Sequence, residues 1–201
     1  MKFTLRHLVY IAVFGALWGA IEMTLGAYLH VLLPPGASYL PLVGTAITAL
    51  GLAVALVGRR FVPQAGSIFM IGVVAALLKL LSVGGVKLGP LLGILIESGL
   101  AEVVLLATGR AGRFSFALAG ALAVASAIPQ QFLFASLFLG RNLYQTYQGM
   151  IKEGGGVFAL EARYALVILG LLLLIDLALG GLAGALAWEV GRIAQVRLAR
   201  E

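Results

Sequence analysis

The sequence predicts an all-α membrane protein that crosses the bilayer six times, with both ends of the chain in the cytoplasm. Three observations lead to this fold class. The 201 residues are 62% hydrophobic and only 11% charged, whereas soluble domains are close to half apolar and a quarter charged. Apolar runs of roughly 20 residues, long enough for a ~30 Å hydrocarbon core, fill nearly the whole chain. Basic residues also alternate between successive predicted loops.

Each predicted span ends at a break of turn-forming or charged residues. The breaks are Pro34-Pro35-Gly36, Arg59-Arg60 with Pro63, Gly84-Gly85, Gly109–Arg113 and a longer polar segment over 140–162. By apolar length and punctuation, the predicted spans cover residues 8–32, 39–58, 65–82, 88–108, 114–139 and 163–190.

The distribution of charge orients these spans. Nine basic residues fall on one side, namely Lys2, Arg6, Arg59, Arg60, Arg110, Arg113, Arg192, Arg197 and Arg200. Four fall in loops on the other side, namely Lys87, Arg141, Lys152 and Arg163. Because cytoplasmic loops carry an excess of Lys and Arg, both termini are predicted to be cytoplasmic. The net charge of +6 is therefore read as a topology signal, and no nucleic-acid partner is expected.

The composition also excludes several classes of protein. No segment remains for a soluble catalytic or nucleotide-binding domain, so residues 1–201 are expected to form a single transmembrane domain. The absence of cysteine excludes disulfides, thiolate chemistry and Cys-based metal sites. Lys2 and Arg6 before an apolar run resemble a signal peptide, but the run is long, contains Glu22 and lacks a clear cleavage site, which favours a mature helix.

Ionisable and amide side chains inside the spans indicate a polar pocket. A charged residue costs at least ~2.5 kcal/mol at the bilayer centre, so such residues usually face a cavity or a partner. At 1.5 Å per residue, Glu22, Glu97 and the Gln130-Gln131 pair lie roughly 12–16 Å below the outer surface. Lys79 begins roughly 5 Å below it and can reach inward, whereas Asp176 and Glu102 lie roughly 20 Å down. The outer layer predicts an outward-facing pocket.

Structural readings of the same residues stay open. Lys79 can extend to the outer interface, or pair with Glu22 or Glu97 and hold helices together. The glutamines can satisfy carbonyl groups freed by a kink at Pro129. Asp176 shares a helical face with Gly180 and Gly184, which suits an interhelical hydrogen bond. The polar segment 140–162 is either a lid over the pocket or a mobile connector.

Small residues recur along the first predicted span. Ala12, Ala16 and Ala20 follow one another at every fourth position. On a helical wheel they share one broad face with Gly15, Gly19, Met23, Gly26 and Ala27. Small residues let helix backbones approach closely, and by default such faces pack a bundle internally. The length of this face favours an external partner as well.

With six spans, both ends inside and this alanine row, the chain resembles the substrate-binding S components of energy-coupling factor (ECF) transporters. In that family the first-helix Ala-xxx-Ala motif, matched by Ala12, Ala16 and Ala20, docks onto a separate transmembrane T component. The resemblance implies two further ATPase subunits that use ATP, and neither a cofactor nor a catalytic or metal site in this chain. No Gly-x-x-x-x-Gly-Lys-Ser/Thr run is present.

The resemblance also implies a ligand and a place in the cell. The ligand is a vitamin or vitamin precursor captured from outside, and the segment Gly15–His30 looks closest to thiamine-precursor-type or uncharacterised members. The membrane is a bacterial or archaeal cytoplasmic membrane. The mixed acids, amides and amine fit a small polar heterocycle, without singling out a cation or an anion. The implied binding residues are Glu22, Lys79, Glu97, Gln130 and Gln131, with Tyr144 or Tyr147 from the 140–162 segment.

Other functions compete with this one. A stand-alone ion- or proton-coupled carrier is the main alternative, because the intramembrane carboxyl groups can serve as a relay. An intramembrane enzyme is disfavoured, since only His7 and His30 exist, at opposite ends of one helix, and no Ser faces His30 at depth. The scarcity of histidine also disfavours a metal-uptake component. A purely structural membrane subunit stays open.

Overall fold

The computed structural model describes residues 3–32, 41–81, 88–109, 111–140, 142–158 and 161–198. Within these ranges the chain is helical, without strands, and a 3-10 turn over Ala162–Tyr164 leads into the last helix. The helices are α1 Leu5–Leu32, α2 Pro41–Phe61, α3 Ser67–Lys79, α4 Leu88–Thr108, α5 Arg113–Ala125, α6 Ala127–Leu139, α7 Leu143–Phe158 and α8 Ala165–Leu198. The predicted turns at 33–38 and 83–87 lie outside the described residues.

The prediction of an all-helical chain is confirmed for the described residues. Five helical stretches of the described chain are long and apolar enough to cross a bilayer: Leu5–Leu25, Leu42–Phe61, Leu88–Thr108, Arg113–Phe138 and Ala165–Leu198. The predicted third span corresponds to α3, an apolar helix of 13 residues. At 1.5 Å per residue α3 is about 20 Å long, shorter than a ~30 Å hydrocarbon core.

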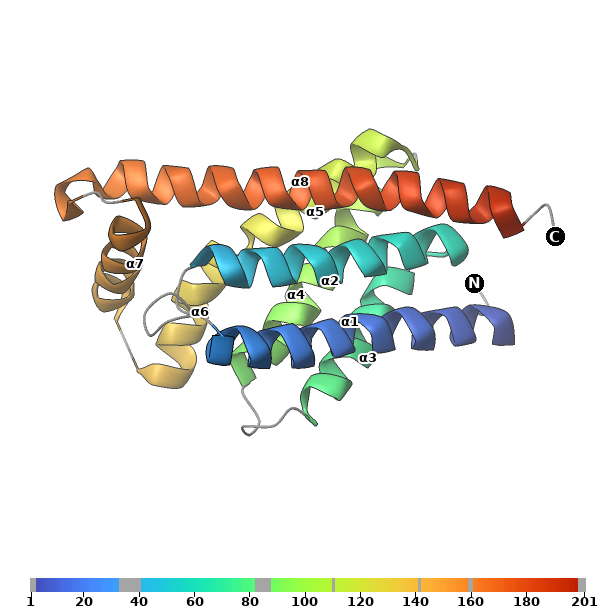
Figure 1. Ribbon diagram of the computed structural model, residues 1–201, viewed down its shortest axis with the longest axis horizontal. Helices are drawn as coiled ribbons and strands as arrows, with labels where there is room; N and C mark the ends of the chain where they lie inside the picture. Colours follow the sequence, from blue (N-terminus) through green and yellow to red (C-terminus); the bar gives the residue numbers. More distant parts are fainter. Residues whose placement is uncertain are drawn as a thin grey trace.

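A bend divides the predicted fifth span into α5 and α6. Pro129 has no N–H to donate to the carbonyl group of Ala125, so the regular helical ladder is interrupted there. Ser126 lies at the junction, where its hydroxyl donates to the carbonyl of Ala123 (2.6 Å). The bend turns α6 toward α7 (Figure 1).

The prediction of a loop over 140–162 is wrong, because residues 143–158 form α7. The helix begins with reciprocal capping: the Gln145 N–H donates to Asn142 Oδ1 (2.8 Å), and the Asn142 N–H donates to Gln145 Oε1 (3.2 Å). Met150 and Ile151 are buried on the inner face of α7. Ile151 packs in a cluster with Ile168 and Leu172 of α8. The glycine run 154–156 lies within the helix.

Glycines bring α5 and α8 into backbone contact. Gly180 and Gly184 of α8 lie against Gly120 and Phe116 of α5 so closely that a Cβ at any of these glycines would overlap the backbone of the other helix. Small residues at four-residue spacing permit this approach. Figure 1 shows α8 and α2 running alongside each other, with α1 beyond α2 and α7 standing across one end of the bundle.

An ion pair ties the α2–α3 connection to α4. Arg59 Nη1 lies 3.0 Å from Glu102 Oε1 and 3.0 Å from the hydroxyl of Ser67. The other carboxylate oxygen of Glu102 accepts the backbone N–H of Ile68 (2.9 Å) at the start of α3. Since Glu102 is buried, these contacts compensate for its removal from water. Glu102 is therefore a structural group in this fold.

Candidate ligand pocket

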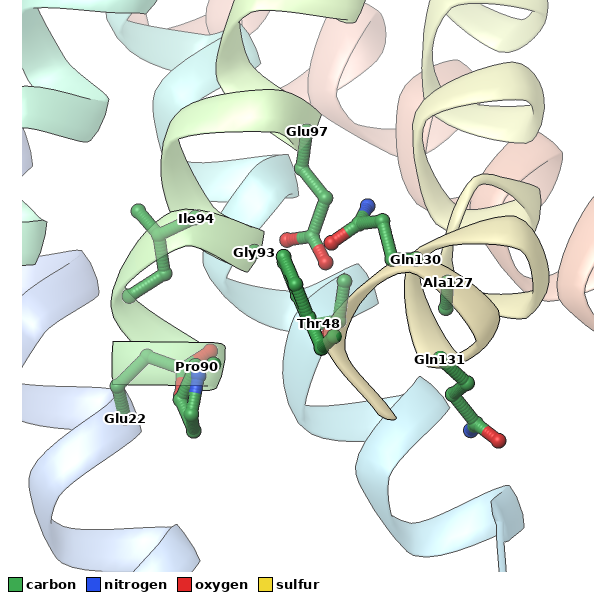
Figure 2. Close-up of a pocket in the computed structure, with 11 residues that line it drawn as sticks. Glu22, Thr48, Pro90, Gly93, Ile94, Glu97, Ala127, Gln130 and Gln131 are labelled. Carbon is green, nitrogen blue, oxygen red and sulfur yellow. The ribbon is translucent and has the colours of Figure 1, made fainter. Parts of the chain in front are cut away.

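One pocket in the described structure is lined by four helices, α1, α2, α4 and α6. Its volume is about 290 Å³, at the lower end of the roughly 300–1,000 Å³ range of ligand pockets, so it suits a small molecule. Figure 2 shows side chains of the four helices converging on it. The lining residues are Glu22, Thr48, Gly89, Pro90, Gly93, Ile94, Glu97, Ala127, Gln130, Gln131 and Phe134.

Glycines on α4 make the space for this pocket. Gly89, Gly93 and Glu97 follow one another at four-residue spacing and therefore share one face of the helix. A Cβ at Gly93 would lie 3.3 Å from Oε1 of Gln130 and 3.8 Å from Oε1 of Glu97. The Gly89–Gly93 pair, predicted as a helix-packing motif, thus borders a cavity.

Glu97 is the most deeply placed carboxyl group in the pocket. Glu97 is 6% exposed, and its carboxyl group points toward Gln130 (Figure 2). Among the described residues, the structure places no hydrogen-bond donor or basic group in contact with it. A buried polar group of this kind normally has a partner, so Glu97 is available to a ligand.

Gln130 is positioned by the bend between α5 and α6. Its Nε2 donates to the hydroxyl of Ser126 at 2.7 Å, and its residue is only 6% exposed. This contact differs from the predicted alternative in which the glutamine satisfies a free carbonyl group. Gln131 also lines the pocket but is exposed.

Glu22 lines the same pocket but already has a partner. Lys79 Nζ lies 3.3 Å from Glu22 Oε2 and donates to the backbone carbonyl of Glu22 at 2.8 Å. Both side chains are largely buried, with 11% and 17% of their areas exposed. The pair joins α1 to the end of α3, which is one of the structural readings that the sequence left open.

Replacing Lys79 with methionine should destabilise the protein more than removing both charges. Lys79→Met leaves the Glu22 carboxylate buried without its cation, and breaking a buried pair in this way costs about 3 kcal/mol or more. The double variant Glu22→Gln/Lys79→Met removes both charges together. Thermal unfolding in detergent should therefore give a lower Tm for Lys79→Met than for the double variant. A double variant as unstable as the single one would contradict the pairing.

Tyr144, Tyr147 and Asp176 are not among the residues that line the pocket. Tyr144 is 68% exposed, and its hydroxyl accepts a hydrogen bond from Gln148 (2.9 Å). Tyr147 packs on the α7–α8 cluster. Asp176 accepts a hydrogen bond from the hydroxyl of Thr45 (2.7 Å), which joins α8 to α2. The side chain of His30 is outside the described residues.

Sequence reasoning missed the apolar lining and Thr48. Phe134, Ile94 and Pro90 form walls of the pocket, yet each reads as an ordinary apolar or helix-initial residue in a membrane span. Thr48 lies on the face of α2 that borders the pocket, as Glu97 does on α4 (Figure 2). A threonine is common in membrane helices, so only the helix arrangement identifies it.

The alanine row of α1 faces outward. Ala12, Ala16 and Ala20 are exposed, whereas Gly15 and Gly19 are buried against α3, where a Cβ would lie 2.5 Å from Cβ of Val74 and 2.8 Å from Cβ of Leu78, respectively. The single broad face drawn on the helical wheel is therefore divided. Gly15 and Gly19 pack within the chain, and Ala12, Ala16 and Ala20 are left uncovered by the described residues.

Comparison of the chain with models of protein families, with curated proteins and with solved structures found no match.

Proposed function

We propose that the chain is a membrane-embedded substrate-capture subunit of an ECF-type importer. Its substrate is a vitamin or vitamin precursor, such as a precursor of thiamine. The observation that carries this proposal is the small pocket that ends in Glu97, a buried carboxyl group without a partner among the described residues. A concave, mostly apolar site with a few convergent polar groups is the usual form of a small-molecule site.

The proposed topology has six crossings with both termini in the cytoplasm of a bacterium or archaeon, α3 serving as a short third crossing. Figure 1 supports it, because α1 begins and α8 ends at the same end of the bundle. Basic residues gather at that end as well. The Arg60 guanidinium stacks on the Trp188 ring at 4.0 Å, which places the end of α2 beside the last turns of α8. Positive charge at one membrane face is typical of the cytoplasmic side.

The proposed partners are a transmembrane T component and two ATPase subunits, which would use ATP outside this chain. The exposed row Ala12, Ala16 and Ala20 supports docking through α1, since small residues admit a partner helix at short distance. The row is flanked by Val13 and Leu17, which are 49% and 50% exposed. An apolar partner surface in the membrane matches this composition.

A relay of carboxyl groups, as in a stand-alone carrier, has less support. Glu22 is paired with Lys79, Glu102 with Arg59, and Asp176 accepts the Thr45 hydroxyl. These three contacts join different pairs of helices, and only Glu22 shares a pocket with Glu97. The discriminating measurement is the energy source: an ECF subunit needs its ATPases for uptake, whereas a carrier responds to an ion gradient alone.

Native mass spectrometry of the purified protein should reveal a bound small molecule. Glu97→Ala should weaken the affinity for this molecule by roughly tenfold and so lower the occupied fraction, since losing one charged hydrogen bond of about 1.5 kcal/mol raises Kd by that factor. The matched control is Glu161→Ala, which removes an exposed carboxylate outside the pocket. Equal occupancy in wild type and Glu97→Ala, or no bound molecule after expression in a vitamin-replete medium, would contradict the proposal.

A further inference from the structure

The polar end of the pocket presents hydrogen-bond acceptors. The Ser126 hydroxyl has one hydrogen, which it donates to the Ala123 carbonyl, so toward Gln130 it can only accept. The amide NH₂ of Gln130 must therefore face Ser126. The carbonyl oxygen of Gln130 is therefore left on the pocket side. This oxygen and a carboxyl oxygen of Glu97 both lie within 4 Å of the position that a Cβ at Gly93 would occupy.

The charges around the pocket are unbalanced. No basic residue is part of the described lining, and Lys79, the partner of the lining residue Glu22, is committed to it through two contacts, with the carboxylate and with the backbone carbonyl. Glu22 therefore contributes little net charge to the cavity. Glu97 has no basic neighbour of this kind in the described structure, so in its ionised form it sets the sign of the potential at the polar end.

Apart from Glu22, Thr48 and Gln131, the rest of the lining is apolar. Pro90, Ile94, Ala127 and Phe134 line the pocket with carbon surface. Phe134 offers an aromatic ring, whose face attracts cations as well as apolar groups. The volume of about 290 Å³ restricts the occupant to a compact molecule.

From this arrangement we infer that the ligand is a small nitrogenous cation, an amine, amidine or protonated heterocycle. Its N–H groups bind between the Glu97 carboxylate and the Gln130 carbonyl oxygen, and its compact apolar part lies against Ile94 and Phe134. The inference rests on the proposed function, because it assigns a ligand class to that same pocket. An anion at this end would meet the Glu97 carboxylate and the Gln130 carbonyl oxygen, and the described lining supplies no basic side chain to offset them.

Charged thiol reagents can measure this preference directly. The natural chain has no cysteine, so Thr48→Cys introduces one thiol, inside the pocket. The probes are 2-aminoethyl methanethiosulfonate, a cation, and 2-sulfonatoethyl methanethiosulfonate, an anion of similar size. Rates are measured on the purified protein in detergent and divided by the rates with free 2-mercaptoethanol. The corrected rates should favour the cation by roughly tenfold, the ratio that about 1.4 kcal/mol produces.

Two further variants in the Thr48→Cys background locate the source of the preference. Glu97→Gln keeps the size of the side chain and removes its charge, so it should bring the corrected ratio close to one. Glu22→Gln/Lys79→Met removes the paired charges and should leave the ratio as it was. The inference is overturned if the two reagents react with Thr48→Cys at equal corrected rates, or if the anion reacts faster. It is also overturned if the double variant loses the preference for the cation while Glu97→Gln keeps it.

The outcomes separate this inference from the proposed function. Modification of the thiol in Thr48→Cys without a charge preference keeps an accessible pocket and rejects only the ligand class. Absence of modification by both reagents, in a protein whose unfolded form reacts fully, means that the pocket is closed to small molecules. That result would reject the proposed function and the ligand class together.

Discussion

Replacing Ala16 with phenylalanine should abolish uptake of the ligand by the complete transporter and leave ligand binding to the isolated chain unchanged. Ala16 is exposed on α1 and is the middle residue of the row with Ala12 and Ala20. A phenyl ring there faces lipid in the isolated chain and has room. In the assembled transporter it would hold the partner helix away, because close helix approach depends on small residues.

The measurement has two parts, uptake in cells that express all subunits and binding to the purified chain. The control is Ala178→Phe, the same substitution at an exposed position of α8, which should keep both activities. Loss of binding in Ala16→Phe would show that the row packs internally, and full uptake would show that it has no role in docking. Co-purification with the T component should fall in parallel with uptake.

Replacing Gly184 with leucine should prevent the chain from folding. A Cβ at this position would overlap the backbone of Phe116 on α5, and a backbone cannot move aside as a flexible side chain can. Overpacking of a core by side chains typically costs about 1–3 kcal/mol, and separating α5 from α8 along their length would cost more. The variant is therefore expected to yield no monodisperse protein in detergent.

The matched control is Gly170→Leu, on the same helix. A Cβ at Gly170 meets no atom within 4 Å, so this variant should give a normal yield and a Tm close to that of the natural chain. Fluorescence-detected size-exclusion chromatography compares the two directly. A folded Gly184→Leu protein with an unchanged Tm would show that α5 and α8 are not in backbone contact.

Local sequence signals predicted the helices well where apolar length and helix breakers agree. Residues 88–108, between Gly84-Gly85 and Gly109, form α4 with the predicted bounds. The same reasoning failed for α7, since its polar residues and four glycines resemble a loop. The capping pair Asn142 and Gln145 was present in the sequence as a helix start. Counting apolar residues alone could not find an amphipathic helix that buries one face.

The pocket was partly predictable because depth along a helix follows from residue number. Glu22, Glu97 and Gln130 were expected at one level, and the structure places all three around one cavity. The partners of these groups were not predictable. Whether Lys79 reaches Glu22, Glu97 or the membrane surface depends on how α3 is rotated against α1, and that rotation is set by Gly15 and Gly19.

Composition and residue order were sufficient to predict an all-helical chain with apolar helices of membrane-spanning length, since the cost of exposing backbone polar groups to lipid leaves few alternatives for so apolar a chain. They also placed carboxyl and amide groups at one depth. Only the packed structure decided which of these groups are compensated within the described chain: Lys79 faces Glu22, Ser126 turns Gln130, and Glu97 keeps a free carboxyl group. Depth is a property of one helix, whereas pairing depends on the rotation of each helix against its neighbours.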